Sequence, residues 1–269
     1  MFIRFCCVAL FILCSSLSSV YGQKVDLSRQ YKLELEEIQT QLAEFEHDPY
    51  LGALVSDVLV RLPDYQEVVL DGLEIAQRCS IHVVLQMHDY IGSSQYEQQQ
   101  ALDSQSKLRD FLEANQFDVI GFEGNQLEHV TFQALLDDAL IQAEKQGIIV
   151  TRSQLEQGIA ASLPFDGVLM FLNEHPDADI VGIEDLALNR LHDTILGLLQ
   201  QGYGIGASLE EVNFRLSDLR SDLAVAKLAR RLSTSQGTSG ALPIGYLHET
   251  RLRKVFQRYG ISGDFIDLR

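Results

Sequence analysis

The sequence predicts an α/β fold with a mainly parallel sheet that carries helices on both faces. The first observation is a set of four short apolar runs, IHVVLQMHD, DVIGFE, DIVGIE and LPIGYLH, which lack the alternation of a half-exposed strand. Continuous runs of this kind are typical of strands that are covered on both sides. The second is that helical periodicity separates the runs, which indicates β-α-β units. Because ligands bind outside the carboxyl ends of such strands, we expect the functional site there.

Composition limits the class of partner. The chain has 269 residues, of which 46% are hydrophobic, and this is enough for a sizeable core. The chain has 38 acidic and 21 basic residues, which gives a formal charge of −17. A surface with this much negative charge repels the phosphate backbone of nucleic acids. We therefore expect no nucleic-acid partner, and a soluble chain or a cationic partner fits this charge better. The substrate expected at the strand-end site is a peptide or a small molecule.

The first 22 residues have the pattern of a signal peptide. Arg4 supplies a positive charge, FCCVALFIL is a short apolar stretch, and Gly22 ends the expected cleavage site. We expect an exported protein, periplasmic or secreted, without an integral membrane anchor after cleavage. A lipoprotein attached through Cys14 is the second interpretation, although Leu13 is large for that motif.

Cysteine usage limits the metal chemistry. After cleavage Cys79 is the one cysteine left, so we expect neither an internal disulfide nor a thiolate-rich zinc site. Any metal must then be held by histidine, carboxylate and water.

The mature chain is predicted to be a single α/β domain over 23–269, with a helical cover over 26–77 and a core from about residue 78. The cover contains a helix over 26–46 and helical or mixed segments on either side of Pro63. In the core, apolar periodicity predicts helices over 97–115, 132–146, 165–174, 186–201, from a capping box at Ser208 to about 232, and over 249–259, with a short one from Ser153. Two more strands are expected at 148–151 and near 265–268, and STSQGTSG over 233–240 is expected to be a flexible connector.

An internal similarity connects the strand ends. DVIGFE and DIVGIE match at Asp, Gly and Glu, and with the flanking histidines they give the order His88, Glu123, Glu184, His248. This order predicts an internal half-repeat of two β-α-β units that each supply one histidine and one glutamate. Glycines near the strand ends leave room for a ligand or a close backbone; they are Gly121, Gly182 and Gly245.

These four side chains suit a divalent metal. Two imidazoles and two carboxylates are ligands for Zn, Mn, Fe or Co, and a bound ion lowers the pKa of water. We predict a metal centre of His88, Glu123, Glu184 and His248, in which Glu123 or Glu184 takes the proton during hydrolysis of an amide or ester. The structural alternative is that an acid at a strand end caps the next helix or pairs with an arginine.

Four further residues are candidates for supporting the metal or binding substrate. Asp185 follows Glu184, His129 lies shortly after Glu123, and two arginines follow the last two motifs, Arg190 and Arg251. The sequence has no glycine-rich phosphate loop, Gly-x-Ser-x-Gly elbow or His-Glu-x-x-His helix, which disfavours a kinase, a serine hydrolase and a zincin protease.

A strand ending in His, a strand ending in Glu, a later Val-Gly-Ile-Glu-Asp and a C-terminal Gly-x-x-His together resemble the superfamily that joins TraB/PrgY and GumN proteins, Tiki metalloproteases, erythromycin esterases and ChaN-type haem-binding lipoproteins. The resemblance covers about residues 78–262 and implies an α/β core with its site at the strand ends. In the Tiki-like branch it implies metal-dependent peptide cleavage through two Gly-x-x-His motifs. Gly245 to His248 matches one motif, whereas Leu85 stands where the other glycine belongs, which leaves a divergent ChaN-like or esterase-like member open.

Three hypotheses follow. The favoured one is an exported metal-dependent hydrolase of a peptide or ester. The second is a haem- or iron-binding protein without turnover, and the third is a non-catalytic module that binds a partner.

Overall fold

The computed structural model describes residues 28–88, 94–202 and 206–269. The chain forms two compact units that divide between Gln66 and Glu67. The expected signal peptide and Cys14 lie outside the described residues. None of the described helices is long and apolar enough to cross a membrane.

The first unit is helical. A helix over 28–43 buries Tyr31, Leu35 and Leu42, which share one face because they recur at helical spacing. The carboxylate of Asp48 accepts hydrogen bonds from the main-chain amides of Tyr50 and Leu51, in the turn that precedes α2 (Gly52–Ala76). The segments expected on either side of Pro63 form this one helix, with Pro63 inside it, and its residues from Glu67 on belong to the second unit.

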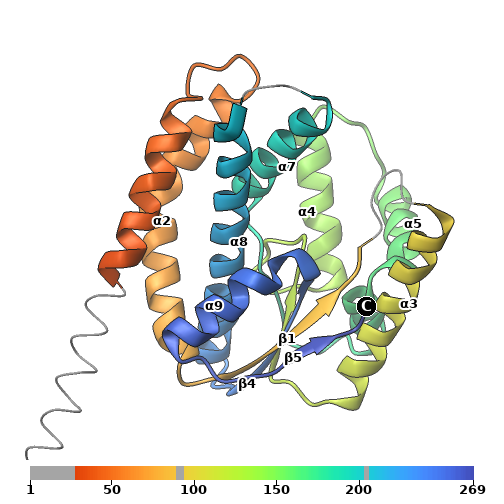
Figure 1. Cartoon of the computed structure of the whole chain (residues 1–269). Coiled ribbons are helices and arrows are strands. Elements are labelled where there is room, and N and C mark those ends of the chain that lie inside the picture. Colours follow the sequence, from red (N-terminus) through yellow and green to blue (C-terminus); the bar gives the residue numbers. More distant parts are fainter. Residues whose placement is uncertain (1–27, 89–93, 203–205) are drawn as a thin grey trace, which may run out of the picture. The chain divides into compact units, whose positions relative to one another are not determined.

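The second unit contains a five-stranded sheet in the order β3-β2-β4-β1-β5. Figure 1 labels three of its strands, β1, β4 and β5. All the neighbouring strands are parallel, which confirms the predicted fold class. The strands are β1 (Ser80–Gln86), β2 (Val119–Phe122), β3 (Ile180–Gly182), β4 (Ser239–Gly245) and β5 (Phe265–Asp267).

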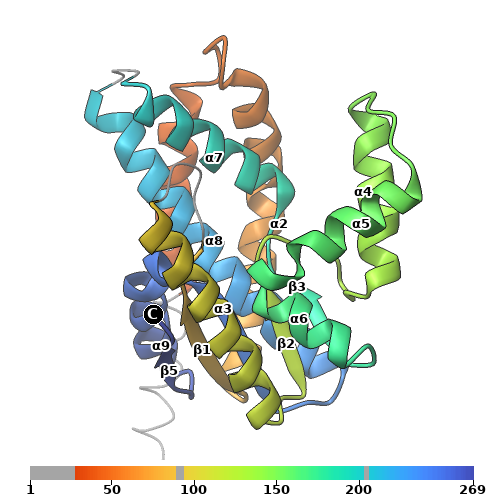
Figure 2. The same ribbon diagram turned by 90° about the vertical axis from the view of Figure 1, so that its right-hand side faces the viewer.

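Helices cover both faces of this sheet, with α3 and α6 in front of the strands in Figure 2. The described helices of this unit are α3 (Gln95–Ala114), α4 (Phe132–Lys145), α5 (Arg152–Ser162), α6 (Gly167–Glu174), α7 (Leu186–Gln200), α8 (Gly206–Thr234) and α9 (Glu249–Tyr259), with the short 3-10 helices η1 (Leu163–Phe165) and η2 (Tyr246–His248). On the α3 side, the core cluster includes Leu108, Ile120 and Leu172. On the other side α8 packs directly against β4. A Cβ at Gly240 in β4 would lie only 3.0 Å from the side chain of Leu232 in α8.

The strand predicted at 148–151 is wrong. Ile149 is fully exposed, and Thr151 instead caps α5, which begins one residue before the expected Ser153. A β-branched run favours a strand, but a strand also needs a neighbour for its main-chain hydrogen bonds. Here the amide of Ile148 bonds to the carbonyl of Ala143 in the preceding helix.

Two predicted boundaries differ from those in the structure. Since α8 begins at Gly206, Ser208 lies inside its first turn. The connector expected over 233–240 is shorter, because α8 continues to Thr234 and β4 begins at Ser239.

The two matching motifs lie on neighbouring strands. Ile120 pairs with Ile180, so Gly121 faces Val181 and the two motifs are offset by one residue. A half-repeat would relate β1 to β3 and β2 to β4. Exchanging the strands within each pair turns the order β3-β2-β4-β1 into β1-β4-β2-β3, which is the same order counted from the other edge of the sheet. This symmetry is what a half-repeat requires, although one helix connects β1 to β2 and two connect β3 to β4.

Candidate active site

Three polar side chains follow three adjacent strands. β4 lies between β2 and β1, and the chain continues from these strands into Glu123, His88 and His248. Parallel strands end at one edge of the sheet, so these residues meet there although they lie far apart in the sequence.

Glu123 is held by the ends of both other strands. Its Oε2 accepts a hydrogen bond of 2.7 Å from the amide of Gly245 and lies 2.8 Å from Nε2 of His88. The side-chain amide of Gln86 donates to the same oxygen over 3.4 Å. A Cβ at Gly245 would lie 3.3 Å from the His88 ring and 3.6 Å from Glu123 Oε1, so the absence of a side chain gives the cluster its room.

His248 approaches the other oxygen of the same carboxylate. It is 6% exposed, and its Nε2 lies 3.8 Å from Glu123 Oε1. Its Nδ1 lies 2.8 Å from the hydroxyl of Ser221, which itself donates to the carbonyl of Ser217 at 2.9 Å. When the single proton of this hydroxyl goes to the Ser217 carbonyl, its oxygen accepts from Nδ1–H. In that tautomer Nε2 of His248 carries a lone pair and faces a carboxylate oxygen.

The pKa values follow from these contacts. Burial raises the pKa of Glu123, but the hydrogen bond and charge of His88, with the charges of His248 and Arg220, lower it to about 2. Burial lowers the pKa of His88, yet the same contact with Glu123 raises it overall. For His248 burial is the largest effect, and its pKa falls to about 4. Glu123 is thus ionised and His248 neutral at neutral pH.

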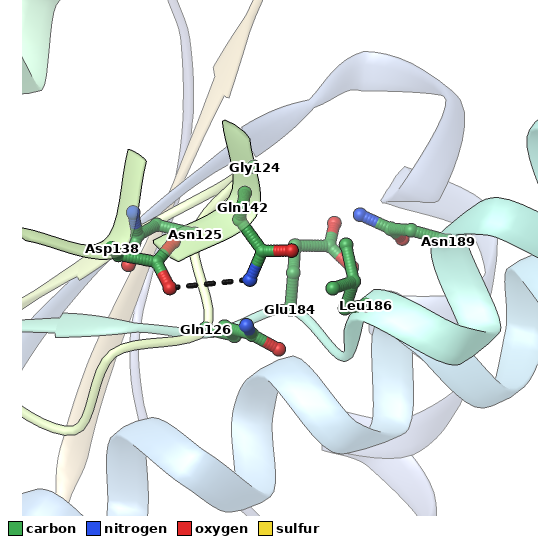
Figure 3. Close-up of a pocket in the computed structure, with 8 residues that line it drawn as sticks. All are labelled: Gly124, Asn125, Gln126, Asp138, Gln142, Glu184, Leu186 and Asn189. Carbon is green, nitrogen blue, oxygen red and sulfur yellow. Dashed lines mark hydrogen bonds between the residues drawn. The ribbon is translucent and has the colours of Figure 1, made fainter. Parts of the chain in front are cut away.

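Glu184 is bound differently from the other three predicted ligands. Its carboxylate accepts two N–H groups of Arg220, at 2.8 and 3.3 Å, and its carbonyl accepts from the Lys227 ammonium. Its side chain lines a separate small cavity with Gln142 and Asn189 (Figure 3). Burial raises the pKa of this carboxyl, and the charge of Arg220 opposes the rise.

The four supporting candidates have mostly structural contacts. Asp185 caps α7 through the amides of Ala187 and Leu188. His129 is half exposed and lies 3.7 Å from Asp179, which precedes β3 at the opposite end of the sheet. Arg190 is exposed. Arg251 lines the cavity beside His248, but its guanidinium is paired with Asp222 and Asp218.

The cluster opens into a cavity of about 520 Å³. His88, Glu123, Gly245 and His248 form one part of its lining, and the rest comes from α7, α8, η2 and α9. A cavity of this size with a few converging polar groups is typical of a small-molecule or active site.

No family model, curated protein or solved structure matches this chain. The resemblance to the TraB, Tiki and ChaN superfamily therefore stays a prediction, and the chemistry of the cavity has to be inferred from its own side chains.

Sequence reasoning missed the contribution of α8. Arg220 holds Glu184 and also contacts His192, at 3.1 Å, while Ser221 orients His248. Both residues lie in the middle of a helix, where no strand end marks them. The available signal is the run Arg220-Ser221-Asp222 in a helix whose neighbouring residues Leu219 and Leu223 are buried.

A second group lies elsewhere on this unit. Among the described residues it is the one in which three metal-ligating side chains offer atoms that all lie within 4.8 Å of one another, and its members are Glu113, Glu174 and His175. The three are largely exposed, His175 Nε2 lies 2.5 Å from Glu113, and Arg109 pairs with Glu174. These contacts satisfy the charges without an ion.

Proposed function

We propose that this protein is an exported hydrolase that cleaves an amide or ester bond at His88, Glu123 and His248 with the help of a divalent metal ion. The proposal joins the chemistry expected from the sequence to the cluster at the three strand ends.

One observation supports it above the others. In the tautomer in which Ser221 accepts from Nδ1–H, Nε2 of His248 and Oε1 of Glu123 are both hydrogen-bond acceptors, and they face each other across 3.8 Å. Two acceptors repel each other unless something positive or proton-bearing lies between them.

The donor set fits a metal ion. Imidazole nitrogen and carboxylate oxygen are ligands for Zn, Mn, Fe and Co, and Glu123 and His248 would hold such an ion between them. When bound, a divalent cation lowers the pKa of water and polarises a carbonyl group. The other oxygen of Glu123 stays fixed by the Gly245 amide, so the carboxylate keeps its orientation.

His88 is the side chain placed to move a proton. It is hydrogen-bonded to Glu123 and lines the cavity, and its side chain is 34% exposed and hence open to a substrate. Glu184 and Arg220 form a buried ion pair beside the cluster, and their charges act on Glu123.

The test is hydrolysis of a peptide library and an ester panel by the mature protein, before and after chelation and after addition of Zn, Mn, Fe or Co. We expect activity to disappear with the chelator, return with one of the metals, and be lost in His248→Ala and in Glu123→Gln. Ser217→Ala is the matched control, because its main-chain carbonyl remains. Chelator-resistant hydrolysis would exclude the metal, and a Soret band on haem titration that disappears in His248→Ala would favour haem binding instead.

A further inference from the structure

Three exposed apolar side chains line the cavity of the cluster and are together called its apolar mouth. Leu196 on α7, Phe214 on α8 and Leu247 on η2 all line the same cavity as His88, Glu123 and His248. Their exposed fractions are 38, 59 and 66%. Three separate elements thus present large apolar side chains to solvent around one opening, where exposure costs free energy unless a ligand covers them.

Charge limits what can cover them. The two arginines of the cavity are already paired, Arg220 with Glu184 and Arg251 with Asp222, so they offer little to an anionic ligand. The exposed charged side chains that line the cavity are the carboxylates of Asp193 and Glu210 and the ammonium of Lys254. Two exposed carboxylates against one ammonium, in a chain of formal charge −17, disfavour an anion.

We infer that the ligand of this cavity is an uncharged amide or ester with a large apolar group, which packs on Leu196, Phe214 and Leu247 while its carbonyl reaches the cluster. The inference rests on the proposed function for the position of the carbonyl group. The apolar contact itself does not depend on hydrolysis, so the two can be tested separately.

The first experiment measures binding of compounds that cannot be hydrolysed. The intact mature protein is titrated with 1-butanol, 1-hexanol and 1-octanol, and with octanoate as the anionic comparison. We expect affinity to rise about two- to fourfold for each added methylene group, as apolar burial predicts. Octanoate should bind more weakly than 1-octanol.

Variants locate the contact. Phe214→Ser and Leu247→Ser should each weaken 1-octanol binding about fivefold or more, because each removes a large apolar contact. Phe165→Ser is the matched control, since Phe165 is 55% exposed but does not line this cavity. An affinity that is independent of chain length, or an equal loss in Phe165→Ser, would overturn the inference.

The second experiment measures kcat/KM for esters with the same series of acyl lengths. If the alcohols bind as expected but no ester or peptide is hydrolysed, the apolar mouth stands and the proposed function fails. If short esters are hydrolysed and kcat/KM does not change with acyl length, the function stands and the apolar ligand class fails.

Discussion

The carboxylate of Glu123 accepts a hydrogen bond of 2.7 Å from the main-chain amide of Gly245, 122 residues further along the chain. The two residues stand at the ends of neighbouring parallel strands, β2 and β4. Because the donor is backbone, the position of this carboxylate depends on the sheet itself and should survive substitution of either histidine.

Gly245→Ala should reduce activity with little loss of stability. The φ of Gly245 is −57°, which any residue can adopt, but the new Cβ would press on the His88 ring at 3.3 Å. We expect about a tenfold loss of kcat/KM from the displaced ring and a change of about 1 kcal/mol in the free energy of unfolding. Gly158→Ala in α5 is the control, because a Cβ there meets nothing within 4 Å. Unchanged kcat/KM would show that the His88 position is not critical.

In the chelated protein, His248 should stay neutral down to about pH 4. The unfolded chain takes up this proton near pH 6.5, so the contribution of His248 to stability falls as the pH drops from 6.5 towards 4, by about 3 kcal/mol. Urea unfolding of the wild type and His248→Gln across this range measures the difference, and NMR titration of the imidazole measures the pKa. Equal pH dependence in the two proteins would argue against a neutral, buried His248.

Ser221→Ala should allow His248 to change from the Nδ1–H to the Nε2–H tautomer. Without the hydroxyl, Nδ1–H loses its acceptor and the ring can carry its proton on Nε2, towards Glu123. Nitrogen-15 NMR of the imidazole distinguishes the two tautomers. Ser217→Ala should leave the Nδ1–H form in place, and a wild-type spectrum for Ser221→Ala would mean that another group sets the tautomer.

Arg220→Met should destabilise the fold by about 3–5 kcal/mol, because it leaves the buried Glu184 carboxylate without its partner. Arg190→Met, at an exposed position, should cost little. The double variant Arg220→Met/Glu184→Leu should recover part of the loss. Chemical unfolding measures all three, and a small effect of Arg220→Met would mean that Glu184 has other support.

The order of elements and the meeting of His88, Glu123 and His248 could be predicted because the relevant signals are local. Buried parallel strands read as continuous apolar runs, and polar residues just after them collect at one edge of the sheet. Strand ends alone do not show which partner a side chain has, so Glu184 could not be separated from the other three.

What could not be predicted depends on contacts between distant segments. Arg220 turns Glu184 into half of an ion pair, and nothing near Glu184 in the sequence indicates a helix residue 36 positions later. Likewise the run at 148–151 has the residues of a strand but no neighbouring strand to pair with, so Ile149 remains exposed. Tertiary context decided both cases.

The metal content of the purified mature protein tests the central claim most directly. Elemental analysis should find close to one divalent metal ion per chain in the wild type and almost none in the His88→Ala/His248→Ala double variant. A Glu113→Gln/His175→Ala variant, altered at the exposed second group, should keep the ion. A wild-type protein without metal, or metal that persists in the His88→Ala/His248→Ala variant and is lost from Glu113→Gln/His175→Ala, would contradict a metal centre at the strand ends.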